Sequence, residues 1–324
     1  MDNNFYSYDP AFERERKIKA IQTLRRHGNL SGMGVLSFVG GSIVIAALLR
    51  ILNLTGLILN DEVFAEVFDI MFTVLAIFIP FLFIMFKVSQ YHLDKTFALN
   101  MPKDKKLALW TIPTGLLLCF AGDRFASIVS SLFSWFGIEL TSSAATIPNS
   151  SAAIFLNILS AVIVAPLVEE FAMRAVVMQP LRKYGEGFAI TMTALVFALM
   201  HQNMVQGIFA FIAGLVFGYI CIITGSVWCS IAVHCLNNLV SELSMLINRS
   251  PEGATVVFYN FIMIVTAVLG ICGIFMILRN KNRNKLKRCE MKNIMTKEKV
   301  TAFLFAPPML IAIVIMLFNC IFRK

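Results

Sequence analysis

The chain has 324 residues, of which 58% are hydrophobic and 15% are charged, and its mean hydropathy is +0.77. Several apolar runs reach the roughly 20 residues that a helix needs to cross a bilayer. A water-soluble domain is therefore excluded, and an all-α polytopic membrane bundle of about eight or nine spans is predicted. The net charge of +9 lies mostly in short segments between the runs, which is the positive-inside pattern. Nucleic acid is not expected as a partner.

In chain order, four segments are predicted. They are a basic cytosolic segment at 1–31, N-terminal spans at 32–150, a core of spans at 151–248, and C-terminal spans at 249–324 with a basic cytosolic loop at 279–299. The apolar stretch 125–138 is short and rich in serine, so we expect a separate interfacial or re-entrant helix there. The last span is expected to run from Val300 to Phe322.

Three charged residues interrupt the apolar run that begins at Ile154. Glu169 and Glu170 are adjacent, and Arg174 follows four residues after Glu170. Ionisable residues inside a membrane span are functional candidates by default. Helix neighbours differ by about 100°, so the two carboxylates face different directions. Glu170 and Arg174 have the i,i+4 spacing of a pair, which leaves Glu169 free. A charge cluster that only ends the helix is the alternative.

Two of the four histidines also fall inside apolar runs. His201 lies four residues after Phe197, and His234 lies four residues before Asn238. At a rise of about 1.5 Å per residue, Glu169 and His201 each lie roughly 20 Å from the cytosolic ends of their helices. His234 and Asn238 lie roughly 12 and 18 Å from theirs. These polar groups are therefore expected at comparable depth, around a polar cavity inside the membrane.

Small residues recur at every fourth position in the run between the two histidines. They are Ala210, Gly214 and Gly218. Such ridges let the backbones of membrane helices approach closely. We expect a packing role for them rather than a chemical one.

The residue types suit hydrolysis of an amide. A carboxylate and an imidazole can share a water and remove its proton as the water attacks a carbonyl carbon. A second imidazole and an amide side chain can donate to the oxyanion that develops. Glu169, His201 and His234 could instead hold a zinc ion. No H-E-x-x-H sequence is present, and a set of one glutamate and two histidines suits either mechanism.

At these residues the sequence resembles the CPBP family, the CAAX-protease and bacteriocin-processing membrane proteins also called Abi. The family's three motifs are E-E-x-x-x-R, F-x-x-x-H and H-x-x-x-N. They occur here in that order, on successive helices, as Glu169 to Arg174, Phe197 to His201 and His234 to Asn238. The resemblance covers 154–248 and does not extend to the other spans.

The resemblance implies an intramembrane endopeptidase. By resemblance, Glu169 and His201 would activate water, and His234 and Asn238 would form the oxyanion site. The family's remaining motif residues, Glu170, Arg174 and Phe197, would support them. Whether zinc takes part is left open by the motifs.

The expected substrate is a membrane peptide or membrane protein, and the lipid bilayer is the expected surrounding. The frequent Lys, Asn and Ile residues favour a bacterial plasma membrane as the location. Two alternatives from other classes are a non-catalytic immunity or partner-binding protein and a proton-relaying transporter. A transporter would usually show an internal repeat, and none is evident in the sequence.

Overall fold

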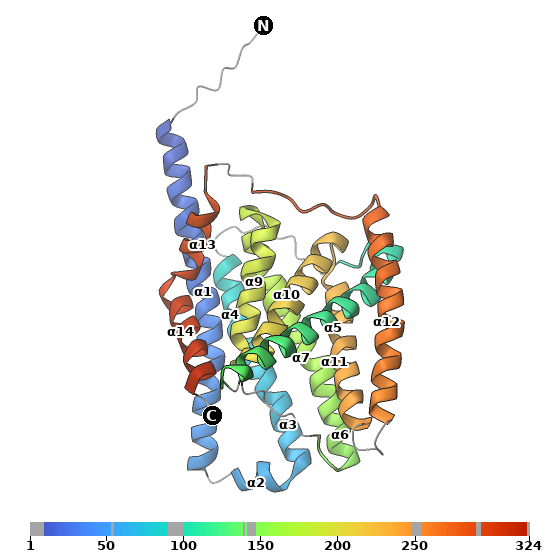
Figure 1. Ribbon diagram of the computed structural model, residues 1–324. Coiled ribbons are helices and arrows are strands. Elements are labelled where there is room, and N and C mark those ends of the chain that lie inside the picture. Colours follow the sequence, from blue (N-terminus) through green and yellow to red (C-terminus); the bar gives the residue numbers. More distant parts are fainter. Residues whose placement is uncertain are drawn as a thin grey trace.

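The computed structural model describes most of the chain, namely residues 10–52, 55–89, 100–138, 140, 147–247, 254–289 and 293–322. This described part is almost entirely helical and contains no strand. Seven of its helices are long and apolar enough to cross a membrane, or eight if one bent pair counts as a span. The predicted all-α polytopic bundle is therefore confirmed (Figure 1). The first nine residues of the predicted basic segment lie outside the described residues.

Helix α1 (Pro10–Ile51) is continuous across the boundary expected at residue 31. Glycines on α1 allow a close approach of the C-terminal helices. A Cβ atom on Gly32 would collide with the backbone of Met309, and one on Gly28 would collide with that of Phe303. The basic part of α1 is therefore an extension of the first span and packs against the C-terminal helices.

The short helix α2 (Thr55–Asn60) precedes the second span. That span is built from α3 (Glu62–Thr73), a π-helical turn at Val74–Phe78 and α4 (Ile79–Ser89). Asp61 caps α3 by accepting hydrogen bonds of 3.0 Å from the backbone N–H groups of Val63 and Phe64. Such caps satisfy donors that the first helical turn leaves free. α3 lies beside α6 at one end of the bundle.

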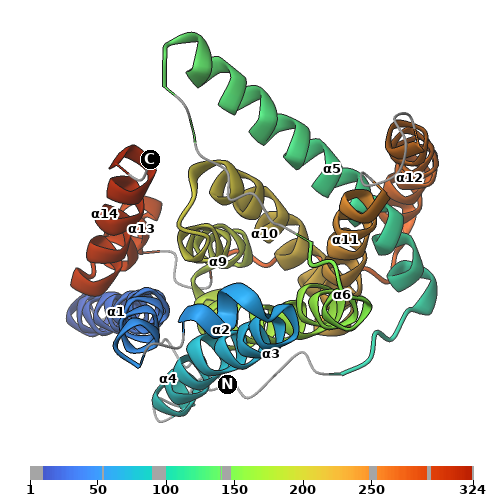
Figure 2. The ribbon, with the colours of Figure 1, turned by 90° about the horizontal axis from the view of Figure 1, so that it is seen from below.

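Helix α5 (Lys105–Trp135) is a single helix of 31 residues. The prediction of a separate interfacial helix at 125–138 is therefore wrong. The charges at Asp123 and Arg124, read from the sequence as the end of a span, pair with each other, and Arg124 also lies 5.5 Å from the ring centre of Tyr259. The helix continues past them and crosses the bundle obliquely (Figure 2).

The predicted last span is a bent pair, α13 (Thr296–Leu304) and α14 (Pro307–Phe322), with an angle of 76° between them. The segment predicted as the last span is therefore bent, because Pro307 and Pro308 follow each other in the middle of it. Proline has no N–H group to donate to the preceding turn, and it disfavours helical backbone in the residue before it.

The core comprises the long helix from Ser151 to Tyr184 and then three more helices. These are α9 (Glu186–Met200), α10 (Met204–Thr224) and α11 (Val227–Ile247), followed at the edge by α12 (Ala254–Arg279). A Cβ atom on Gly214 would lie 2.9 Å from the Cα atom of Ala194 on α9. Ala210 is buried as well. α10 therefore packs closely along α9 through its row of small residues.

Candidate active site

The helix that carries the two glutamates is irregular on both sides of them. A short α-helical piece, α7 (Ala165–Glu170), lies between two π-helical stretches, η2 (Leu159–Val164) and η3 (Phe171–Met178). Pro166 in this piece lacks an N–H donor, which interrupts the regular hydrogen bonding. π-Helical turns change the direction of the following side chains and are frequent at functional sites. The apolar pattern of this span predicts a regular α-helix and does not indicate these π-helical turns.

Glu170 and Arg174 form a buried ion pair. Arg174 donates from Nε to Oε2 of Glu170 at 2.9 Å and from Nη2 to Oε1 at 3.3 Å. Their side chains are 0% and 1% exposed, respectively. Nη1 of Arg174 has no hydrogen-bond partner and lies against Gly218, where an added Cβ atom would approach it to 3.3 Å. The pair expected from the i,i+4 spacing is therefore present, and it occupies one of the two carboxylates.

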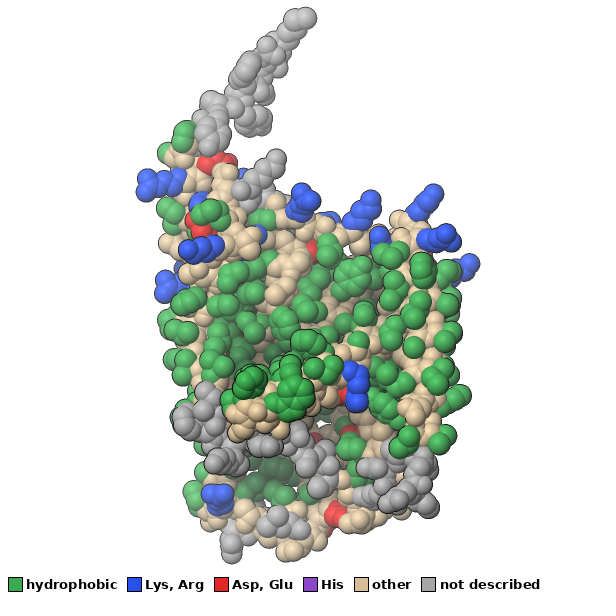
Figure 3. Space-filling view, viewed as in Figure 1, with side chains coloured by type: hydrophobic (Ala, Val, Ile, Leu, Met, Phe, Trp, Pro, Cys, Tyr) green, Lys and Arg blue, Asp and Glu red, His purple; other side chains and the backbone are tan. Residues whose placement is uncertain are grey.

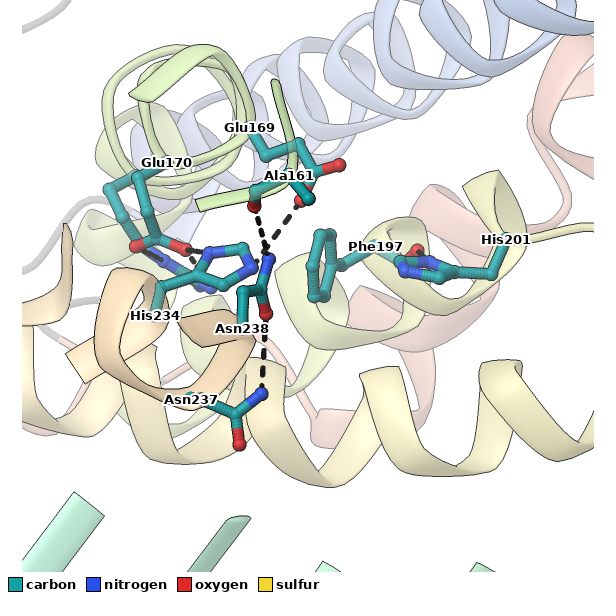
Figure 4. A network of polar contacts seen from close by, with 9 residues as sticks. Ala161, Glu169, Glu170, Phe197, His201, His234, Asn237 and Asn238 are labelled. Atoms are coloured by element: carbon teal, nitrogen blue, oxygen red, sulfur yellow. Dashed lines mark hydrogen bonds and ion pairs between the residues drawn. The ribbon is translucent and has the colours of Figure 1, made fainter. Parts of the chain in front are cut away.

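Glu169 and Glu170 lie at opposite nitrogen atoms of His234 (Figure 4). Nε2 of His234 is 3.6 Å from Oε2 of Glu169, and Nδ1 is 3.4 Å from Oε1 of Glu170. Nδ1 is buried and has no hydrogen-bond partner. The imidazole ring stacks on Phe217 with 4.7 Å between ring centres. His234 is thus fixed on both sides, with Nε2 turned towards Glu169.

Asn238 is held one turn further along α11. Its Nδ2 donates to the carbonyl oxygen of Ala161 at 2.9 Å, and its Oδ1 accepts from Nδ2 of Asn237 at 3.3 Å. These contacts fix the amide of Asn238 beside His234 (Figure 4). The NH2 group of Asn238 has two N–H donors, so one can remain on Ala161 while the other is available to a substrate oxygen.

His201 makes no hydrogen bond or ion pair with Glu169 in the described structure. It follows the last residue of α9, and its Nδ1 atom lies 2.8 Å from the carbonyl oxygen of Phe197. The ring of Phe197 lies between His201 and His234, with ring centres 4.8 and 5.9 Å away. The three motifs thus lie together in the bundle, and the ring of Phe197 separates His201 from His234.

Residues 151–240 match the family model described as type II CAAX prenyl endopeptidase Rce1-like. The resemblance to the CPBP family is confirmed. The matched stretch contains all three motifs, which lie on the helix from Ser151 to Tyr184, at the end of α9 and on α11. No curated protein and no solved structure matches the chain. The match supports a CPBP-type intramembrane protease at the level of the family.

A zinc site made of Glu169, His201 and His234 does not fit this arrangement of the CPBP motifs. Zinc ligands lie about 2.0–2.2 Å from the metal, so their donor atoms must converge. His201 instead turns towards a backbone carbonyl, with Phe197 between it and His234. Within the described ranges, no group of three His, Cys, Asp or Glu side chains could hold a metal ion.

The turn that carries His201 depends on two residues that lie outside the CPBP motifs. Gln202 has a φ angle of 53°, which is strained for a residue other than glycine. Its Nε2 donates to the carbonyl oxygen of Leu199 at 2.9 Å. Its Oε1 accepts from Nδ2 of Asn319 on α14 at 2.7 Å. This contact could not be predicted from helical spacing, because 117 residues separate the two partners.

Replacing Asn319 with alanine should therefore lower turnover while leaving peptide affinity nearly unchanged. A net hydrogen-bond contribution of about 0.5–1.5 kcal/mol corresponds to roughly a twofold to tenfold loss in kcat. Val314→Ala, at an exposed position on the same helix, is the matched control and should keep the normal rate. Equal kcat values in both variants would show that the turn does not need Asn319.

Proposed function

We propose that the protein is an intramembrane endopeptidase that hydrolyses a peptide bond of a membrane peptide or membrane protein. The observation that carries this proposal is the unequal state of the two adjacent glutamates. Glu170 is fully buried and bound to Arg174, whereas the side chain of Glu169 is 19% exposed and faces His234. Only Glu169 is therefore placed to exchange a proton with water.

In the proposed reaction, Glu169 accepts the proton of a water molecule as the water attacks the carbonyl carbon of the substrate. The Nε2–H group of His234 donates to the oxyanion that forms on the carbonyl oxygen, and Asn238 contributes a second donor. The proton then passes to the leaving amine as the C–N bond breaks. Water and amide are consumed, and a carboxylic acid and an amine are formed, between which the acid proton then passes to give a carboxylate and an ammonium group.

His201 would act from the other side of Phe197. As it stands, it can reach the reacting water only after its side chain leaves the carbonyl oxygen of Phe197, since Nδ1 is held there at 2.8 Å. We propose that the substrate, by entering between the helices, displaces Phe197 and brings His201 to the water. Hydrogen bonds of catalytic groups are often completed only in the substrate complex.

The experiment that tests this function is incubation of the purified protein with synthetic single-span membrane peptides. The wild type should cut at least one of them, and Glu169→Ala should bind that peptide without cutting it. A chelator is added in a parallel arm, and unchanged cleavage there is expected from side-chain catalysis. Peptide binding by both proteins without cleavage by either would favour the immunity or partner-binding alternative.

Asn238→Ala separates the oxyanion role from substrate binding. Loss of one oxyanion donor costs about 10²–10³-fold in turnover in well-studied cases. Because this amide stabilises charge that develops only in the transition state, peptide affinity should change little. A variant that loses affinity but keeps its turnover would remove Asn238 from the oxyanion site.

A further inference from the structure

The exposure of side chains on one face of α11 changes along the helix, from one side of the site to the other. Ser230 lies four residues before His234, and Ser241 lies seven residues after it, so all three side chains share a helix face. Ser230 is 0% exposed and His234 is 5% exposed, whereas Ser241 is exposed. This face of α11 is therefore buried towards the beginning of the helix and exposed towards its end.

The connection after α12 covers the closed side. The backbone N–H and Nδ2 groups of Asn284 donate to the carbonyl oxygens of Ile223 and Ile222, both at 3.0 Å. The backbone N–H of Lys287 donates to Oε2 of Glu186 at 2.8 Å. Beneath these contacts lies a layer of side chains that are at most 1% exposed: Arg174, Met178, Leu181, Tyr184 and Phe217.

The opposite side contains polar groups and open space. Asp69 on α3 accepts a hydrogen bond from Ser160 at 2.8 Å, so its carboxylate points into the bundle. Asp69 is nevertheless exposed, so its carboxylate is accessible from outside the bundle. Figure 3 shows the molecule hollowed in this half, below α5. The exposed part of Glu169 is consistent with an open path from this space to the site.

The distribution of Lys and Arg side chains shows which end of the bundle faces the cytosol. Lys and Arg side chains gather at the closed end of the bundle, as Figure 3 shows, and such residues remain on the cytosolic side of a membrane. Helix α9 starts at that end and has only 15 residues, about 22 Å. Its end with His201 therefore lies part-way through the bundle, whereas α1, α3 and α6 extend further towards the open end (Figures 1 and 2).

We propose that the active site is served from the extracytoplasmic side. On the basis of the proposed function, its substrates are membrane polypeptides whose cleaved bond lies in the outer half of the bilayer. A carboxyl-terminal peptide that approaches from the cytosol would meet the covering connection and the buried layer. The route from the outer side instead passes Ser241 and Asp69 before it reaches Glu169.

Cysteine labelling tests the direction of access without requiring cleavage. Three single-cysteine variants are made in a chain whose seven cysteines are replaced: Ser230→Cys, Ser241→Cys and Lys285→Cys. A membrane-impermeant maleimide is added to intact cells and to inside-out vesicles. Ser241→Cys should react in intact cells, Ser230→Cys in neither preparation, and Lys285→Cys, in the cytosolic connection, only in inside-out vesicles.

Reaction of Ser241→Cys only in inside-out vesicles, or its failure to react in both preparations, would overturn the proposal. So would reaction of Ser230→Cys from the cytosolic side. Thermal unfolding of each variant in detergent shows whether it is folded, and Asp69→Cys replaces Ser241→Cys if the latter is not. Because labelling does not depend on turnover, outward access can hold in a protein that only binds peptides, and the two proposals fail separately.

Discussion

Replacing Glu169 with glutamine should lower the rate of peptide cleavage by about 10²–10⁴-fold, the usual contribution of a general base. Glutamine keeps the shape of the side chain but cannot accept a proton from water. The side chain of Glu169 is partly exposed and lies 3.6 Å from His234, so the fold should tolerate the change. The measurements are kcat and the midpoint of thermal unfolding in detergent.

The adjacent glutamate supplies a matched control. Glu170→Gln makes the same chemical change one residue away, but it removes the negative charge from a buried pair with Arg174. This variant should lose thermal stability, whereas Glu169→Gln should not. If both variants lost activity and stability to the same degree, the division between a catalytic and a structural glutamate would be wrong.

Arg174→Ala should lower the free energy of unfolding by about 3–5 kcal/mol, which is typical when one partner of a buried ion pair is removed. Glu170 would then keep a charge in a position that is 0% exposed. Removal of the large side chain also leaves a cavity beside Gly218, since Nη1 of Arg174 packs against that glycine. Thermal and denaturant unfolding in detergent measure the loss.

A double variant separates charge from packing. In Glu170→Leu with Arg174→Met, no buried charge is left unpaired, and apolar replacement of a whole buried pair is often neutral or stabilising. Much of the stability lost in Arg174→Ala should therefore return. An Arg174→Ala protein with normal stability and no activity would instead assign Arg174 a direct part in the reaction.

The sequence was sufficient for the fold class and for most of the spans, because runs of apolar residues of membrane-spanning length are a strong and local signal. Prediction from the sequence failed where charged residues that usually end a membrane span are instead accommodated within a longer helix. Asp123 and Arg124 looked like the end of a span, yet they pair with each other and α5 continues. The proline pair at 307–308 was visible in the sequence, but its effect on the last span was missed.

The sequence was sufficient to predict which residues form the site, but not which of them contact one another. Helical spacing indicated that Glu170 and Arg174 would pair, and they do. The partner of Glu169 could not be read from spacing, because it depends on π-helical turns that redirect the side chains. The structure places Glu169 beside His234 and leaves His201 behind Phe197. Contacts between residues far apart in the chain, such as that of Asn319 with Gln202, cannot be inferred from helical periodicity.

The central claim, that water activated at Glu169 cleaves a peptide bond, is tested most directly by mass analysis of a membrane peptide after incubation in ¹⁸O-labelled water. The wild type should yield two fragments whose masses add up to the peptide plus one water, with a heavy oxygen in the new carboxylate. Glu169→Gln should return the peptide whole. An intact peptide from the wild type, or the same fragments at the same rate from Glu169→Gln, would contradict the account.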